Sequence, residues 1–312
     1  MTDDTRIRAA WLYHVGGFSQ DEVGRRLGLS RFKVLRLLSD ARAAGEVVIS
    51  LDHRCSDTLA LAEALREKLA IRDVLVAPDP GSVDASAARR AVGMVAANWL
   101  RVVAASGPVT VGVGWGRTLS AMADALTGVQ NPDLRVVSLM GAMVRTGPEG
   151  PIDVCARIAQ VAGGQALFLP APFLADSPED AALFMRQRLV REALDAARSA
   201  SHMIVSVGEG GPEALLATSG VIDKADLAAM DAAGVVADTT GKFLRADGTL
   251  APVDLNDRTP AIGLADMARS EVTLLAAGAT KARAARAVLR AGFVDRIVTD
   301  EVTARVLLRG ET

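Results

Sequence analysis

The first fifty residues contain three stretches in which apolar positions recur at helical spacing, separated by glycines. In this part the pattern predicts helices over residues 4–15, 20–27 and 31–44, and a strand over residues 47–51. The apolar face expected for the first helix consists of Ile7, Ala10, Trp11, Tyr13, His14 and Val15. The third helix has the clearest inward face, formed by Val34, Leu37 and Leu38.

Polar residues and a glycine mark the ends of these helices. Ser19, with Glu22 three residues later, has the spacing of a capping box at the start of the second helix. Gly28 suits the left-handed residue that ends this helix, and Ser30 suits the cap of the third. A helix, a short helix, a tight turn and a further helix together predict a helix-turn-helix motif, which places its last helix in a DNA groove.

After residue 55 the pattern changes to short apolar strands that alternate with amphipathic helices. Helices are predicted over 56–70, 85–104, 153–162, 179–197 and 224–232 and from Lys281, and strands over 74–77, 109–111, 135–140, 166–169, 203–207, 235–237, 272–277 and 296–299. A hairpin-like segment is expected over 241–248. This alternation predicts an α/β fold with a mostly parallel sheet. The chain should therefore consist of a helix-turn-helix domain (residues 1–54) and an α/β domain (residues 55–312).

The most suggestive stretch for chemistry follows the strand that begins at Val109. Gly112, Gly114 and Gly116 allow a sharp turn and close approach of the backbone to a ligand, and the helix that follows directs its positive end into the same space. Arg117 could add charge, and Thr118 could cap the helix or donate a hydroxyl. A glycine turn that only connects strand to helix explains the same residues, so this motif alone does not define a site.

Other predicted strand ends also carry small or polar residues, and ligands of parallel sheets bind at such ends. Gly141 would permit close backbone approach, and Gly208–Glu209 follows another strand. Lys281 opens a helix, where the helix dipole disfavours a cation, which makes it a candidate ligand for an anion or a sugar. Asp238 could accept hydrogen bonds from hydroxyls, although a turn aspartate that caps the next residues remains an alternative.

Composition restricts the possible partners. The 312 residues carry a net charge of −2, but residues 1–50 have a balance of +2 and the remainder −4. Only the N-terminal part is therefore suited to contacts with the phosphates of a nucleic acid, unless it is a helical hairpin with a solvated charged face. The candidate DNA contacts are Ser19, Gln20, Ser30, Arg31, Lys33 and Arg36. The two cysteines have neither disulfide nor metal-ligand spacing and suit a reducing cytoplasm, and no apolar stretch has the roughly 20 residues that span a bilayer.

Four stretches together resemble the SorC-type sugar-binding bacterial transcription regulators. They are Ala10-Trp11-Leu12-Tyr13 with the helix-turn-helix, Gly112-Val113-Gly114-Trp115-Gly116-Arg117-Thr118, Gly278-Ala279-Thr280-Lys281, and residues 297–304. The resemblance implies an effector domain similar to sugar-phosphate isomerases and glucosamine-phosphate deaminases but without catalysis. It also implies tetramers that bind operator DNA and respond to a sugar, sugar phosphate or polyol, and it suggests the sugar-alcohol subgroup.

By position, the resemblance puts the effector phosphate near residues 114–118 or Gly141, and the sugar against Asp238 and Lys281. The full set of candidate effector residues is Gly114, Trp115, Gly116, Arg117, Thr118, Gly141, Gly208, Glu209, Asp238 and Lys281. Two departures from the family pattern matter. Ala279 replaces a glycine, and the strand near residue 140 lacks the lysine with which some relatives form a Schiff base. A covalent adduct is not expected there, and no cofactor or metal is expected.

An enzyme is the main alternative to a regulator. A sugar-phosphate isomerase or deaminase with an accessory helical domain would need a general base, and only Asp238 and Glu209 can be placed near the glycine turns, with no histidine beside either. A carbohydrate kinase is a weaker alternative, because the chain lacks the Gly-x-x-x-x-Gly-Lys-[Ser/Thr] phosphate loop.

Overall fold

The computed structural model describes residues 3–47, 56–81, 84–143, 149–211 and 214–310. The chain forms a small unit of residues 1–51 and 127–129 and a large unit of residues 52–126 and 130–312, which we call the body. The predicted boundary between residues 54 and 55 falls outside the described residues, as does all but the first residue of the strand predicted over 47–51. Across the described ranges, no helix combines the length and the apolar character needed to cross a bilayer.

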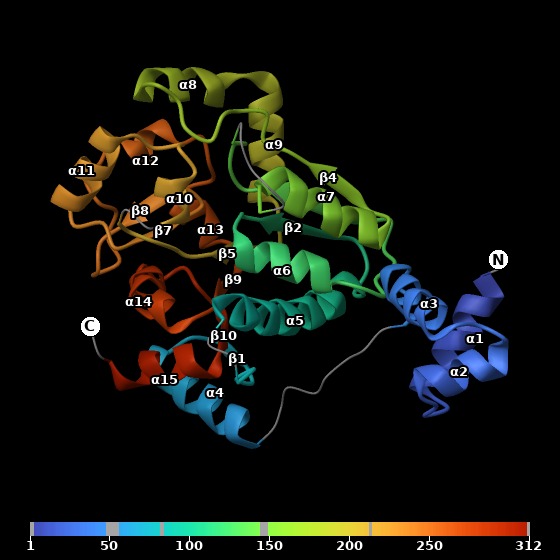
Figure 1. The fold of residues 1–312 in the computed structure, drawn as a ribbon. Coiled ribbons are helices and arrows are strands. Elements are labelled where there is room, and N and C mark those ends of the chain that lie inside the picture. Colours follow the sequence, from blue (N-terminus) through green and yellow to red (C-terminus); the bar gives the residue numbers. More distant parts are fainter. Residues whose placement is uncertain (1–2, 48–55, 82–83, 144–148, 212–213, 311–312) are drawn as a thin grey trace. The chain divides into compact units, whose positions relative to one another are not determined.

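The N-terminal unit contains the three predicted helices: α1 (Asp3–His14), α2 (Gln20–Leu27) and α3 (Arg31–Ala43) (Figure 1). The predicted caps are confirmed. Ser19 and Glu22 form a capping box, Gly28 is left-handed with φ 66°, and Ser30 Oγ accepts from the backbone N of Lys33 at 3.3 Å. Because residues close in sequence fix each of these helix ends, the short α2 and the turn after it depend little on contacts with distant segments.

The core of this unit is smaller than the sequence pattern predicts. Val34, Leu37 and Leu38 of α3 are buried as expected. The apolar face predicted for α1 is wrong in part, since Ile7, Trp11 and Val15 are exposed. The inner side of α1 is formed by Ala9 and Ala10, whose small side chains let the helices approach closely, with Leu12 and Tyr13 partly buried beside them.

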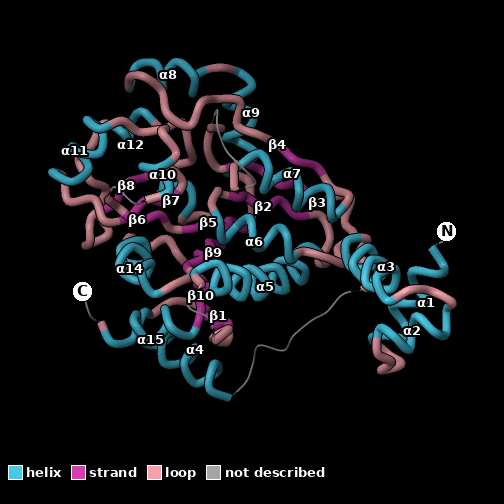
Figure 2. Tube along the Cα trace, viewed as in Figure 1, coloured by secondary structure: helices cyan, strands magenta, loops and turns pink. Residues whose placement is uncertain are grey.

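In the described part of the body, seven strands form one sheet in which every pairing is parallel, in the order β1-β10-β9-β5-β2-β3-β4 (Figure 2). The strands are β1 (Asp73–Ala77), β2 (Val109–Val113), β3 (Leu134–Ser138), β4 (Gln165–Leu167), β5 (His202–Ser206), β9 (Glu271–Ala276) and β10 (Arg296–Asp300). All five residues of β10 are buried, as expected for a parallel sheet covered on both faces. The α/β class predicted from the alternation is confirmed.

Helices connect the strands of the body, and several of them cover the faces of this sheet. They are α4 (Ser56–Leu69), α5 (Ala85–Ala104), α6 (Arg117–Ala125), α7 (Pro151–Ala162), α8 (Pro178–Arg186), α9 (Arg188–Arg198), α10 (Leu215–Thr218), α11 (Lys224–Ala232), α12 (Leu255–Arg258), α13 (Leu264–Met267), α14 (Ala282–Arg290) and α15 (Glu301–Arg309). The single helix predicted over 179–197 is two helices, because Gln187 leaves the helical conformation with ψ 140°.

A second, antiparallel sheet follows β5 directly and was not predicted. Its described strands are β6 (Gly208–Glu209), β7 (Ala237–Thr239) and β8 (Lys242–Leu244). The β7–β8 hairpin turns at Thr240 and Gly241, whose φ values are 51° and 72°, so both central residues are left-handed as in a type I′ turn. The hairpin-like segment predicted over 241–248 contains β8 and a second turn, after which Leu250 pairs back on Leu244. The preceding β7–β8 hairpin was not predicted. The small sheet lies where the carboxyl end of β5 leaves the large one.

Gly141 lies just past the end of β3 in a tightly packed passage. An added Cβ would lie 2.2 Å from the carbonyl oxygen of Pro172, and the Gly141 backbone N donates to the carbonyl oxygen of Pro260 at 2.9 Å. We expect Gly141→Ala to lower the free energy of unfolding by about 2 kcal/mol, because backbone cannot yield as a side chain can. Gly114→Ala is the control, since its Cβ would meet atoms only at 3.5 Å or more. Urea unfolding measures both, and equal losses would contradict the steric explanation.

Candidate functional site

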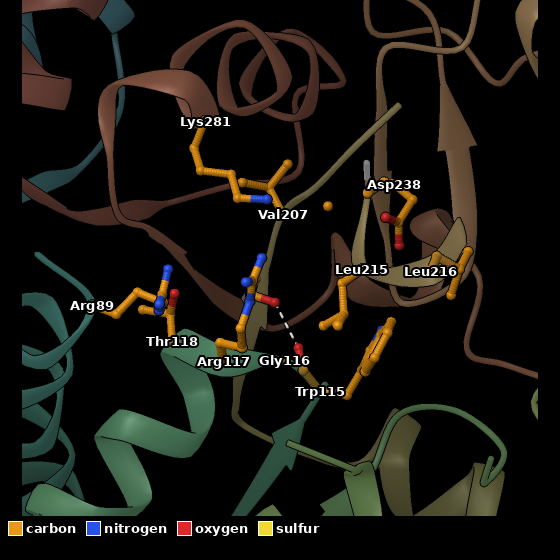
Figure 3. Close-up of a pocket in the computed structure, with 13 residues that line it drawn as sticks. Arg89, Trp115, Gly116, Arg117, Thr118, Val207, Leu215, Leu216, Asp238 and Lys281 are labelled. Atoms are coloured by element: carbon orange, nitrogen blue, oxygen red, sulfur yellow. Dashed lines mark hydrogen bonds between the residues drawn. The ribbon is translucent and has the colours of Figure 1, made fainter. Parts of the chain in front are cut away.

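A pocket of about 530 Å³ opens at the carboxyl ends of β2 and β5. These neighbouring strands lie where the strand order reverses, since the chain runs outward from β2 through β3 to β4 and returns to the other side of β2 as β5. Such a reversal leaves the two following loops on opposite sides of a crevice. The residues that line the pocket are Arg89, Trp115, Gly116, Arg117, Thr118, Ser206, Val207, Gly208, Ala214, Leu215, Leu216, Asp238 and Lys281 (Figure 3).

The first turn of α6 forms one wall of this pocket. Gly116 precedes the helix with φ 120°, and no described side chain caps the first amides of α6, an arrangement that suits an anion. An added Cβ at Gly116 would lie 2.9 Å from Ser206 Oγ, which itself donates to the carbonyl oxygen of Trp115 at 2.6 Å. This bond holds the turn after β2 against the end of β5. The predicted cap role of Thr118 is wrong, because Thr118 lies inside the helix and is buried.

Two guanidinium groups lie beside this helix start. Arg89 comes from α5 and is half-buried, and Arg117 is the first residue of α6. Figure 3 shows both side chains at the same side of the pocket as Thr118. Burial, and then repulsion from Arg117, lower the pKa of Arg89 below its usual value. Two like charges held together in this way would be stabilised by an anion between them.

Asp238 lies across the pocket, in the middle of β7 rather than at the end of a strand or in a turn. Its carboxyl group is buried, which raises its pKa to about 6, while the charge of Lys281 lowers it in part. Gly208 pairs with Asp238 across β6 and β7, and an added Cβ there would lie 1.7 Å from Asp238 Oδ1. Gly208 is therefore needed so that the carboxyl group fits beside β6.

Lys281 is the last residue of a short 3₁₀ helix, η1 (Ala279–Lys281), between β9 and α14, and it reaches the pocket from there. Its Nζ donates to Glu209 Oε2 at 3.0 Å. Burial would raise the pKa of Glu209, but the Lys281 ammonium and the Thr280 hydroxyl hold it below its usual value. The pair fixes the ammonium group at the pocket wall, and Glu209 is already engaged by a cation.

Most of the predicted effector residues therefore meet at one place. Trp115, Gly116, Arg117, Thr118, Gly208, Asp238 and Lys281 line the pocket, and Glu209 adjoins it through Lys281. Gly114 and Gly141 are not among the lining residues. Gly114 N donates to the carbonyl oxygen of Ile204 at 2.9 Å, and Gly141 packs on the backbone at Pro172.

Sequence reasoning missed several lining residues. Ser206 ends β5, so the rule used for the other strand ends would have found it. Arg89 is different, because it lies inside a long helix with no motif around it, and only the packing of α5 on α6 brings it to the pocket. Leu215 and Leu216 of α10 add an apolar wall that no spacing indicated.

A second candidate site is the outer face of α3 in the N-terminal unit. Arg31, Lys33 and Arg36 are exposed, while the opposite face of α3 fills the core. Arg36 Nε lies 3.9 Å from Asp40 Oδ2, an exposed pair that holds the arginine weakly. The first turn of α3 contains no acidic residue. This face is positively charged and free of core contacts, as a groove-binding helix requires.

The other predicted DNA contacts already have partners within this unit. Ser19 Oγ donates to Glu22 Oε2 at 2.7 Å, and Ser30 Oγ accepts from the Lys33 backbone. Gln20 Oε1 accepts from Arg31 Nε at 3.4 Å. The serines therefore fix the starts of α2 and α3, and Gln20 orients Arg31 on the exposed face.

The chain is similar to known proteins along nearly its whole length. Residues 53–309 match a family model described as "Putative sugar-binding domain". The chain is 35% identical over 307 residues to the Erythritol catabolism regulatory protein EryD of Brucella abortus (strain 2308), covering 98% of this chain and 96% of that protein. It is 28% identical over 310 residues to the transcriptional regulator LsrR of Enterobacter sp. (strain 638), covering 96% and 91%.

Solved structures share the fold. The full-length sorbitol operon regulator SorC from Klebsiella pneumoniae aligns with a TM-score of 0.75 at 20% identity, covering 99% of each chain. A DeoR family transcriptional regulator from Listeria monocytogenes aligns with a TM-score of 0.75 at 24% identity, covering 81% of this chain and all of that one.

Proposed function

Because this chain belongs to the SorC-type family of sugar-binding transcriptional regulators, we propose that a small phosphorylated sugar or polyol binds the pocket and controls the binding of α3 to operator DNA. The observation that carries the proposal is the meeting of Arg89, Arg117 and Lys281 with Asp238 in one pocket. Three cations and the start of α6 suit a phosphate group. A buried carboxylate suits hydroxyl donors.

The chemistry of the pocket favours a polyol phosphate over an apolar ligand. Asp238 lies opposite the two arginines, so a ligand with its phosphate at one end and hydroxyls at the other would satisfy both sides. The name of the relative EryD refers to the catabolism of erythritol, a four-carbon polyol. This supports erythritol phosphates as the first ligands to test, with other polyols and sugar phosphates beside them.

DNA binding by a helix-turn-helix commonly requires two units at a fixed spacing, and we propose that the chain acts as a homo-oligomer. The resemblance to the SorC-type family makes a tetramer the expected state. The effector would favour one of two arrangements of that assembly, only one of which spaces the α3 helices for the operator. A chain with this role would act in the cytoplasm, where its operator lies.

The direct test uses the full-length chain. DNA that it retains from a random pool is sequenced, and binding of the enriched sequence is followed by fluorescence anisotropy while erythritol, its phosphates, ribose 5-phosphate and glucosamine 6-phosphate are added in turn. We expect one enriched motif, whose affinity at least one phosphorylated ligand changes. Failure to enrich any sequence would contradict the proposal, as would an affinity that no ligand alters.

We also propose that the pocket binds its ligand without turning it over. No histidine lines it among the described residues, and Glu209 is already paired with Lys281. Asp238 is then the remaining candidate base. Incubation with ribose 5-phosphate and glucosamine 6-phosphate should yield no isomerised or deaminated product. Product formation that disappears in Asp238→Asn would support the enzyme instead.

Arg36 provides a test of the DNA-facing side of α3. We expect Arg36→Ala to weaken binding to the selected DNA and to reduce the slope of log K against log salt by about 0.9, the contribution of one phosphate contact. Anisotropy titrations at several salt concentrations measure the slope. The control is Arg191→Ala, an exposed arginine of the body, which should leave the slope unchanged. An unaltered slope for Arg36→Ala would exclude a phosphate contact there.

A further inference from the structure

The side chain of Phe32 is 84% exposed although it is aromatic. It is the second residue of α3. Of the apolar residues that follow it in this helix, Val34, Leu37 and Leu38 turn into the core, whereas Leu35 is 50% exposed. Single apolar residues on a surface are common and need no explanation by themselves. The position is what makes Phe32 informative, since the first turn of the last helix is the part of a helix-turn-helix that meets base edges.

The charges around Phe32 indicate what kind of partner covers it. Arg31 and Lys33 flank it in sequence, Arg36 follows one turn later, and all three are exposed. A symmetric contact with a second copy through this face would bring like charges together, which is unfavourable. A polyanion would be attracted to the same face. Phe32 is therefore placed to meet duplex DNA, an inference that rests on the proposed function.

The chemistry of the major groove then limits what the ring can recognise. The base edges there present hydrogen-bond donors and acceptors, together with one apolar group, the 5-methyl of thymine. A phenyl ring cannot pair with the polar groups. We propose that Phe32 contacts the 5-methyl group of a thymine in each half-site. This contact makes Phe32 a specificity-determining residue for T·A at that position. Contacts of the neighbouring cations with phosphates would position the helix without distinguishing bases.

Replacement of thymine by deoxyuridine tests this contact, because it removes only the methyl group. In the DNA selected by the wild-type chain, each thymine is replaced in turn and binding is measured by anisotropy. One position per half-site should weaken wild-type binding about 4-fold, the value expected for one buried methyl. In Phe32→Ala the same replacement should have no effect. Ile7→Ala, which truncates an exposed apolar residue of α1, should retain the wild-type loss.

The possible outcomes separate this inference from the function on which it rests. If the wild-type chain selects a DNA sequence but no thymine shows a loss specific to Phe32, the inference is overturned and the regulator remains supported. If the chain selects no sequence, both are overturned. Circular dichroism of Phe32→Ala should match that of the wild type, since the ring makes no core contact. A loss at one thymine that vanishes only in Phe32→Ala establishes the contact.

Discussion

Replacement of Lys281 by glutamine is expected to abolish most of the stabilisation that the effector gives to the folded chain. A ligand at one hundred times its dissociation constant should raise the free energy of unfolding of the wild type by about 2.7 kcal/mol. Lys281 Nζ is held at the pocket wall, 3.0 Å from Glu209 Oε2. Truncating the charged partner of a contact between a protein and its ligand costs about 2–5 kcal/mol, or at least about 30-fold in affinity. At the same ligand concentration the stabilisation should fall below about 1 kcal/mol.

The structure supplies controls for this experiment. Lys224→Gln removes an exposed lysine of the body and should leave the ligand effect intact. The double variant Glu209→Gln with Lys281→Gln removes the carboxylate that would otherwise lose its partner, so it tests whether misfolding explains the loss. Ligand-dependent unfolding in urea measures all three, and binding of effector-free protein to the selected DNA should be unchanged. An undiminished ligand effect in Lys281→Gln would remove this lysine from the site.

The helix boundaries could be predicted from sequence wherever local chemistry fixes them. The side chains of Ser19 and Ser30 accept hydrogen bonds from the first turns of α2 and α3, and Gly28 ends α2 in a left-handed conformation. All three behave as expected. The starts of α5 and α11 agree for the same reason, since Asp84 and Asp223 cap them through side-chain hydrogen bonds. Local signals of this kind depend little on the rest of the fold.

The predictions that failed depend on contacts between distant segments. The strand predicted over 235–237 is shifted to β7 because it pairs with β6 and β8, and this shift is what puts Asp238 inside the small sheet. Trp11 matches the helical period, yet the neighbouring helices contact Ala9 and Ala10 instead. Hydrophobic spacing gives a face of a helix but not which part of that face a neighbour covers.

The site was predictable to the extent that it consists of strand ends. The order of β2 and β5 brings Arg117 and Gly208 together, as the general rule for parallel sheets requires. Arg89 could not be predicted, since its role comes from the packing of two helices. The site therefore has a larger positive charge than the sequence motifs indicated.

Asp238→Asn is expected to change how stability depends on pH. The ordinary pKa of 3.8 is raised to about 6 in the folded chain, because burial disfavours the charged carboxylate and Lys281 offsets only part of this effect. Between these values the folded chain holds a proton that the unfolded chain releases, so stability falls as pH rises from about 4 to 6. Above pH 6 the loss is complete and amounts to about 3 kcal/mol.

Asparagine has nearly the same shape but no charge, so the variant should lack this loss. Urea unfolding without effector should give similar stabilities for the two proteins at pH 4, and a difference in favour of Asp238→Asn that grows to about 3 kcal/mol by pH 7. Asp231→Asn, an exposed carboxylate of the body, is the control and should follow the wild-type curve. Parallel curves for the wild type and Asp238→Asn would contradict the assignment.

The same carboxyl group should make effector binding depend on pH. A ligand hydroxyl that donates to Asp238 stabilises the charged form, so binding lowers the pKa of Asp238 and becomes stronger as pH rises through about 6. Calorimetric titration of a neutral polyol avoids the ionisation of a phosphate and isolates this group. Its affinity should rise in the wild type and stay constant in Asp238→Asn. A rise of equal size in both proteins would show that another group is responsible.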